Sequence, residues 1–154
     1  MRLLTALLAL LLLVSVPDCA AARNLPVEIV IVQTHTGKHV FRMEVAADDA
    51  SRELGLMHRR HLANNAGMLF DFRTAVMTAF WMKDTPLPLD MLFVRADGTI
   101  STIAANAVPF STKEIFSAEP VRAVLEINGG LSKALGIAPG DQVQASFFPK
   151  SARH

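Results

Sequence analysis

Short segments rich in apolar and β-branched residues alternate with turn residues along the chain, and this pattern predicts a mainly β fold. The clearest pair of strands is 27–34 and 39–46, which a glycine-containing turn at 35–38 joins. Further strands are predicted at 68–72, 76–83, 89–95, 100–105, 121–128 and 141–148. Regular turns without long helices favour a compact antiparallel β barrel or a two-layer sandwich, with about seven or eight strands and two short helices.

The stretch 67–95 stands apart because apolar residues occupy both faces of its segments, which is typical of strands that are covered on both sides. It contains the only tryptophan, Trp81, and four of the nine phenylalanines. Two prolines keep the loop 83–88 out of any sheet. The polar residues that interrupt the stretch are Asp71, Lys83, Asp84, Thr85 and Asp90. A buried charge is costly unless it is paired, so these residues need partners or a wet pocket.

Two short helices are predicted between the strands. Asp48 or Asp49 can cap the first helix. Its buried side is predicted to consist of Ala50, Leu54 and Met57. The second helix, at 129–136, begins after a glycine pair and ends at a glycine. The polar segment 106–119, with one helical turn near 113–116, has a length that is typical of functional or mobile loops.

The first residues of the chain predict a secretory signal peptide. Arg2 precedes an apolar run at 3–16, and small residues follow this run up to Ala22. The run is shorter than the roughly 20 residues of a membrane span, so we expect cleavage after Ala22 and export to the periplasm or the extracellular space. An uncleaved anchor is the alternative. We do not expect a lipoprotein attached through Cys19, because Asp18 stands where a small residue is needed.

Removal of residues 1–22 leaves residues 23–154, a length typical of a single domain. The mature chain then has no cysteine and therefore no disulfide and no thiol nucleophile. The formal net charge of +1 is unchanged by the loss of Arg2 and Asp18. A charge this small gives no electrostatic basis for binding nucleic acid, and no integral membrane span is expected after cleavage.

Neither a cofactor nor a metal site is expected. The histidine pairs at 35 and 39 and at 58 and 61 lack a third ligand in register, and histidines on the surface explain both pairs. No serine lies in a nucleophile elbow of the G-x-S-x-G type. The sequence therefore contains no motif for nucleophilic or metal-assisted catalysis.

Five motifs together resemble the domain of unknown function 192 (DUF192) family. They are GLM at 55–57, GMLFDF at 67–72, FWMKDTPLPLDMLFV at 80–94, LEINGG at 125–130 and LGIAPGD at 135–141. Their order and spacing agree with the family over nearly all of the predicted domain. The resemblance implies a single, mainly β domain that is often exported in bacteria and also occurs in archaea. It implies no established activity, cofactor or substrate.

The face at 81–90 is the candidate site, because an apolar pocket with a few convergent polar groups is the usual site for a small ligand. We expect a non-enzymatic module that binds a small ligand, an envelope component or a protein partner there. The candidate residues are Trp81, Lys83, Asp84, Thr85, Asp90, Asn128, Arg59, Arg60 and Glu126. Alternatively, Trp81 lies in the hydrophobic core. The alternative for Arg59 and Arg60 is a position at a solvated helix end.

Two other functions are compatible with the same residues. An exported hydrolase or lyase could use two of the carboxyl groups of Asp84, Asp90 and Glu126 as acid and base, if their environments separate their pKa values. Alternatively, the domain is purely structural. Asp90 would then be a structural carboxylate that accepts hydrogen bonds from backbone donors of the loop.

Overall fold

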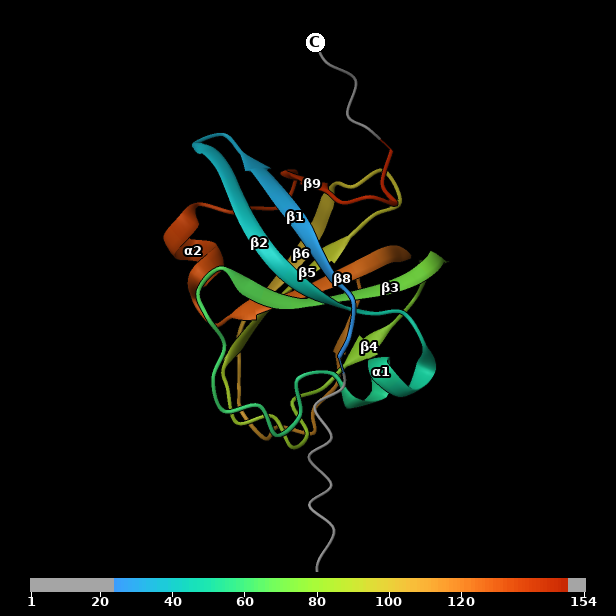
Figure 1. Cartoon of the computed structure of the whole chain (residues 1–154), viewed down its shortest axis with the longest axis vertical. Coiled ribbons are helices and arrows are strands. Elements are labelled where there is room, and N and C mark those ends of the chain that lie inside the picture. The colour runs from blue at the N-terminus through green and yellow to red at the C-terminus, as the bar shows by residue number, and fades with distance from the viewer. Residues whose placement is uncertain (1–23, 150–154) are drawn as a thin grey trace, which may run out of the picture.

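Within residues 24–149, which the computed structural model describes, seven strands form one curled sheet and two form a small second sheet (Figure 1). The order of the large sheet is β6 (Ile100–Ala107), β5 (Leu89–Val94), β8 (Val121–Asn128), β3 (Ala66–Val76), β2 (Gly37–Ala46), β1 (Val27–Thr34) and β9 (Gln142–Gln144). The small sheet pairs β4 (Ala79–Phe80) with β7 (Ile115–Phe116), and the helices are α1 (Asp49–Leu54) and α2 (Leu131–Leu135). The predicted mainly β fold is confirmed. The predicted signal segment 1–22, with Cys19, lies outside the described residues.

The large sheet curls into a half-barrel because its two edges approach each other. Thr99, just before β6, forms a bridge with Gln142 of β9. The amide of Val143 donates to the carbonyl of Gly98 at 2.8 Å. One pairing differs from the predicted antiparallel arrangement, since β2 and β3 run parallel and the chain between them, with α1, makes the crossover that a parallel pair requires.

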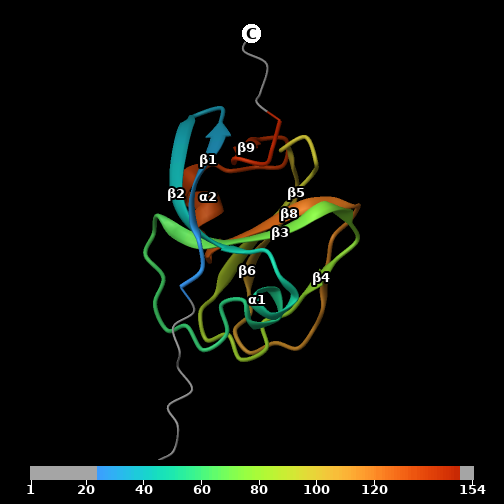
Figure 2. The ribbon, with the colours of Figure 1, turned by 45° about the vertical axis from the view of Figure 1, so that its right-hand side comes forward.

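The neighbouring strands β5, β8 and β3 are covered on both faces, as the apolar pattern predicts. The barrel-side core takes a buried residue from each strand of the large sheet: Val30, Phe41, Leu69, Leu92, Ile100, Leu125 and Val143. The helix-side core lies on the opposite face and includes Met68, Phe70, Met91, Phe93 and Val124 under Leu56, Leu62 and Met82. In Figure 2, α1 lies beneath β3 and β8 on this second side.

The local predictions hold best where a turn defines the element. The β1–β2 hairpin and β8 match their predicted ranges closely, and α2 is bounded by Gly130 and Gly136. Asp48 caps α1, because its carboxylate accepts a hydrogen bond from the Ser51 amide at 2.8 Å. The predicted inner side of α1 is wrong. Ser51 is the buried helix residue, and Leu54 is 37% exposed.

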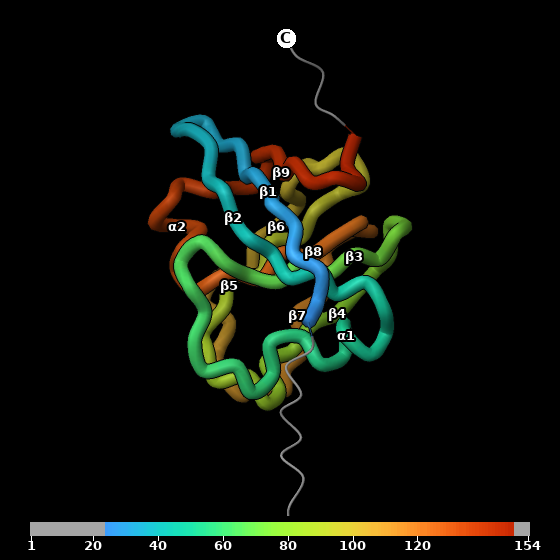
Figure 3. The backbone as a smooth tube through the Cα atoms, viewed as in Figure 1, coloured from blue at the N-terminus to red at the C-terminus, as the bar shows by residue number. Residues whose placement is uncertain are grey.

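Three predicted elements are wrong in length or type. The strand predicted at 76–83 is reduced to β4, because the chain turns at Met82, whose carbonyl accepts from the Thr85 amide at 3.1 Å. The strand predicted at 141–148 is only β9, since a turn closes between Ala145 and Phe148. The helical turn predicted near 113–116 is instead the strand β7, which lies beside β4 (Figure 3).

Gly67→Ala is expected to destabilise the fold by about 2 to 3 kcal/mol, because the added methyl group overpacks a closed part of the sheet. A Cβ at this position of β3 would overlap the backbone carbonyl of Glu126 and lie 2.8 Å from Cε of Met43. Urea denaturation measures the effect. Gly140→Ala is the comparison: no atom lies within 4 Å, but φ is +96°, so we expect a cost of only about 1 kcal/mol from the backbone. Equal costs for the two variants would contradict this account of Gly67.

Candidate functional site

A cavity of about 430 Å³ lies between α1, the helix-side face of the large sheet and the small sheet. We call it the aromatic cavity. Its lining residues are Asp49, Arg52, Glu53, Leu54, Gly55, Leu56, Met57, Phe70, Phe72, Thr78, Ala79, Phe80, Trp81, Thr85, Glu114 and Glu126. The volume falls within the range of about 300–1,000 Å³ that is usual for small-molecule sites.

Glu126 is the buried polar group of the aromatic cavity. It lies on β8, an interior strand of the large sheet, between Met68 of β3 and Met91 of β5, and only 4% of it is exposed. Within residues 24–149 its side chain forms no hydrogen bond and no ion pair. Burial raises the pKa of its carboxyl group to about 8. The cavity therefore holds an acid that is mostly protonated at neutral pH.

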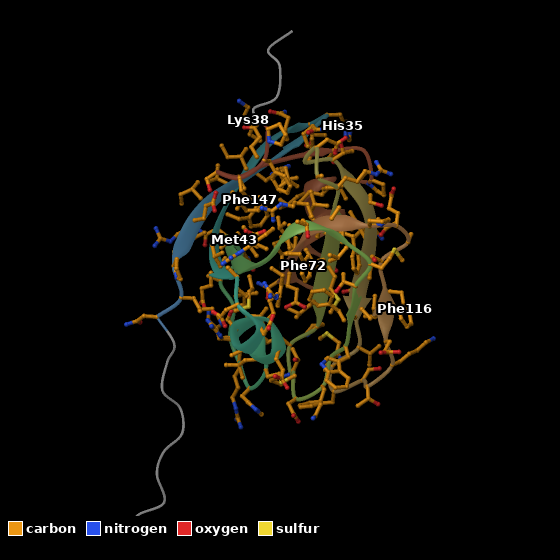
Figure 4. The ribbon with its side chains drawn as sticks, turned by 90° about the vertical axis from the view of Figure 1, so that its right-hand side faces the viewer. His35, Lys38, Met43, Phe72, Phe116 and Phe147 are labelled. Carbon is orange, nitrogen blue, oxygen red and sulfur yellow. The ribbon has the colours of Figure 1, made fainter. Side chains whose placement is uncertain are left out.

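Aromatic rings form much of the cavity wall. Phe80 packs edge to face against Phe70, with ring centroids 4.9 Å apart, and against Phe72 at 6.4 Å. Trp81 is 45% exposed, so its alternative place in the core is not what the structure shows. The ammonium of Lys83 lies 5.4 Å from the centroid of the Trp81 ring. In Figure 4, Phe72 lies near the middle of the molecule above α1, whereas Phe116 of β7 lies at its outer edge.

Three carboxylates and one guanidinium complete the wall of the aromatic cavity. Asp49, Glu53 and Glu114 are exposed acidic residues. The guanidinium of Arg52 donates to Asp49 at 2.6 Å and to two backbone carbonyls, those of Ala47 and Asp71, each at 2.9 Å. Arg52 is thus occupied by protein acceptors, and the excess charge around the cavity is negative.

A second, separate hollow of about 400 Å³ is lined by His58, Arg60, Asp84, Pro86 and Phe110. The amide of His58 donates to the backbone carbonyl of Asp84 at 2.7 Å, which joins the segment after α1 to the proline loop. Of the predicted site residues, Arg60 and Asp84 therefore lie here and do not line the aromatic cavity.

Asp90 is fully buried, and four hydrogen bonds occupy its carboxylate. The donors are the amides of Asn106, Gly130 and Ser132 and the Ser132 hydroxyl, at 2.5–2.9 Å. Burial alone would raise the pKa of Asp90, but the hydrogen bonds from Ser132, Asn106 and Gly130 together bring it below its usual value. Asp90 is thus a structural carboxylate, but its donors lie at the end of β6 and the start of α2 and not in the loop 83–88 as the structural alternative has it.

Two further predicted residues also have protein partners. The guanidinium of Arg59 forms a bidentate pair with the Glu44 carboxylate, with both distances 2.7 Å. The side-chain amide of Asn128 donates to the carbonyl of Leu62 at 2.9 Å. Both contacts hold the segment that leads from α1 into β3.

The nine predicted site residues do not lie together in one site. Trp81, Thr85 and Glu126 line the aromatic cavity, and Lys83 lies against Trp81. The predicted carboxylate pair is not assembled, because Glu126 lines one hollow, Asp84 lines another, and Asp90 is hydrogen bonded on all sides. The contribution of α1 and of Phe70, Phe72 and Phe80 to the site was not among the predictions. The GLM motif was the available signal, since a Cβ on its Gly55 would lie 3.3 Å from the Phe70 ring.

Neither a metal cluster nor a membrane helix is found in the part of the chain that the structure describes. No group of three or more His, Cys, Asp or Glu residues among 24–149 is arranged to hold a metal ion. No helix in the same range is long and apolar enough to cross a membrane.

The chain is similar to known proteins in both sequence and structure. The DUF192 family model, described as uncharacterized, matches residues 30–145. No curated protein matches the sequence. A putative transcription regulator from Sinorhizobium meliloti 1021 is 48% identical, with a TM-score of 0.78 over 80% of this chain and 97% of that chain. A protein of unknown function from Novosphingobium aromaticivorans is 43% identical, with a TM-score of 0.79 over 85% and 94% of the two chains.

Proposed function

The chain belongs to the uncharacterised DUF192 family, and we propose that it is an exported, non-enzymatic module that binds a small ligand in the aromatic cavity. The observation that carries this proposal is Glu126, a buried carboxyl group that lines a cavity of ligand size and has no partner within residues 24–149. A buried polar group without a partner costs about 1 to 3 kcal/mol, so a ligand that bonds to it would remove a cost the free protein carries. Export is supported by the signal-peptide pattern of residues 1–22.

The composition of the cavity supports a ligand more than a protein partner. Nine of its sixteen lining residues are apolar, four of them aromatic, and the other seven are polar or charged. A concave site that combines apolar walls with polar groups is the usual pattern for a small molecule. The cavity is formed by β3, β4, β8 and α1, and α1 is fixed by the hydrogen bonds of Arg52 to Ala47 and Asp71. A site held in this way needs little reorganisation before it binds.

Trp81 makes the proposal directly testable, because it is the only tryptophan and it lines the cavity. We expect a ligand from a screen of amines, alcohols, organic acids and sugars to change the intrinsic fluorescence and to raise Tm. Trp81→Ala should weaken its binding at least tenfold by calorimetry, because stacking and apolar contact are lost. The matched control is Phe116→Ala, which removes an exposed ring outside the cavity and should leave the affinity within twofold. Equal losses in both variants, or no ligand for the wild type, would refute the proposal.

A second candidate function is acid catalysis, which the raised pKa of Glu126 favours. A carboxyl group that stays protonated near neutral pH can act as a general acid. Acid–base chemistry in this cavity would need Asp49, Glu53 or Glu114 as the base, since neither Asp84 nor Asp90 lines it. Conversion of a bound ligand that stops in Glu126→Gln, while binding remains, would favour this candidate over the binding module.

A further inference from the structure

The charges around Glu126 indicate what kind of group would complete its environment. The flanking strands offer only Met68 and Met91 as its neighbours in the sheet. The charged side chains on the other walls of the cavity are Asp49, Arg52 and Glu53 of α1 and Glu114 next to β7. Arg52 is the one cation among these lining residues, and its guanidinium is already bonded to Asp49 and to backbone carbonyls. Glu126 therefore has no cation of the protein available to it within the described cavity wall.

The aromatic wall adds a second, independent feature. The face of an aromatic ring is electron-rich, and cations are attracted to it, most strongly when water is excluded. Two cations of the protein already lie over rings at this site: Lys83 is 5.4 Å from the Trp81 centroid, and Arg52 is 5.8 Å from the Phe72 centroid. The rings of the cavity thus attract positive charge within the protein itself.

We propose that the aromatic cavity binds a small organic cation, an amine whose ammonium group lies against Glu126 and whose apolar body lies against Phe70, Phe80 and Trp81. This inference rests on the proposed function, because it names the class of ligand for the same cavity.

The alternatives fit the cavity less well. An anion would meet the carboxylates of Asp49, Glu53 and Glu114, and Arg52, the cation among the lining residues, is already bonded to protein acceptors. Lys83 lies against Trp81 but does not line the cavity. A neutral ligand could bond to Glu126, but it would leave the negative rim uncompensated. A cation is attracted by the rim and the rings together, and it removes the cost of ionising Glu126.

Three probes of equal chain length separate these cases: hexylammonium, hexan-1-ol and hexanoate. At about pH 8, calorimetry on the purified full chain should give an affinity for hexylammonium at least tenfold higher than for hexan-1-ol, and hexanoate should bind more weakly than the alcohol. If hexan-1-ol or hexanoate binds as tightly as hexylammonium, the inference fails while the proposed binding function stands. If none of the three binds, and no ligand from the wider screen does, both fail.

Glu126→Gln tests the assigned ion pair. Binding of hexylammonium should weaken at least tenfold in this variant, whereas binding of hexan-1-ol should stay within twofold. The matched control is Glu28→Gln, a glutamate of β1 that does not line the cavity. In the wild type, the affinity for hexylammonium should rise about tenfold from about pH 6 to about pH 7, because the cation binds to the ionised form of Glu126. An affinity that is independent of pH, or unchanged in Glu126→Gln, would overturn the inference.

Discussion

Glu126→Gln is expected to raise the free energy of unfolding at about pH 8 by on the order of 4 kcal/mol in the absence of ligand. The carboxyl group of Glu126 is almost completely buried and has a pKa of about 8 in the folded protein. In an unfolded chain the pKa of glutamate is about 4.3. Glutamine does not ionise, so the folded variant avoids the free-energy cost of keeping this acid protonated or of burying its anion.

The sign of the pH dependence follows from the same difference. Between about pH 4 and pH 8 the folded state keeps a proton on Glu126 that the unfolded state has released. The contribution of Glu126 to the free energy of unfolding is therefore greatest below about pH 4 and falls as the pH rises to about 8. Urea denaturation at about pH 5, 6.5 and 8 should show this decline in the wild type and a flatter profile in Glu126→Gln. Glu28→Gln is the control and should decline as the wild type does. Parallel profiles for the wild type and Glu126→Gln would contradict the assignment of a buried, unpaired acid.

Asp90→Ala is expected to destabilise the protein by about 4 kcal/mol, the largest loss that we predict for a polar residue. The substitution removes an acceptor shared by the Asn106, Gly130 and Ser132 amides and the Ser132 hydroxyl, and it leaves buried donors without a partner. Thermal and urea denaturation measure the change. Because hydrogen bonds hold the pKa of Asp90 below its usual value, the stabilisation is present above about pH 4 and is lost as the pH falls below that.

The comparison for Asp90 is Asp141, whose carboxylate accepts one hydrogen bond, from the Ala138 amide at 2.8 Å. Asp141→Ala should cost only about 1 kcal/mol. Asp90→Asn should lie between the two, since it keeps the shape and loses the charge. If Asp90→Ala costs no more than Asp141→Ala, then the four hydrogen bonds contribute little and α2 must be held by its apolar contacts.

Elements determined by neighbouring residues were predictable, and elements determined by distant ones were not. The β1–β2 hairpin follows from alternation around a short turn, and α2 from the glycines at its ends. Nothing in the residues around 76–83 indicates that the chain leaves the sheet there, because the turn depends on contacts such as the Met82 amide donating to the carbonyl of Ser111.

The candidate site shows the same division. Proximity in sequence linked Trp81 to Thr85, and both line the aromatic cavity. Proximity also linked Asp84 to Asp90, but the fold gives one to a different hollow and the other to α2. The alternating pattern of β8 put Glu126 on the side away from Leu125, yet it could not show that α1, some 70 residues earlier, covers that side. Burial of Glu126, which makes the cavity chemically distinctive, is thus a tertiary property.

The seam between β6 and β9 has a consequence for how the chain is made. Residues 142–144 of β9 pair with residues 31–33 of β1, more than 100 positions earlier, and Gln142 also forms the bridge with Thr99 that brings the two edges of the sheet together. A nascent chain that has not yet emerged beyond residue 141 leaves the hydrogen-bonding edges of β1 and β6 open, and open edges can pair with other chains. Closing so distant a contact carries a high entropic cost and is typical of slow folding. During synthesis, the edges of β1 and β6 therefore stay unpaired until residues 142–144 are available.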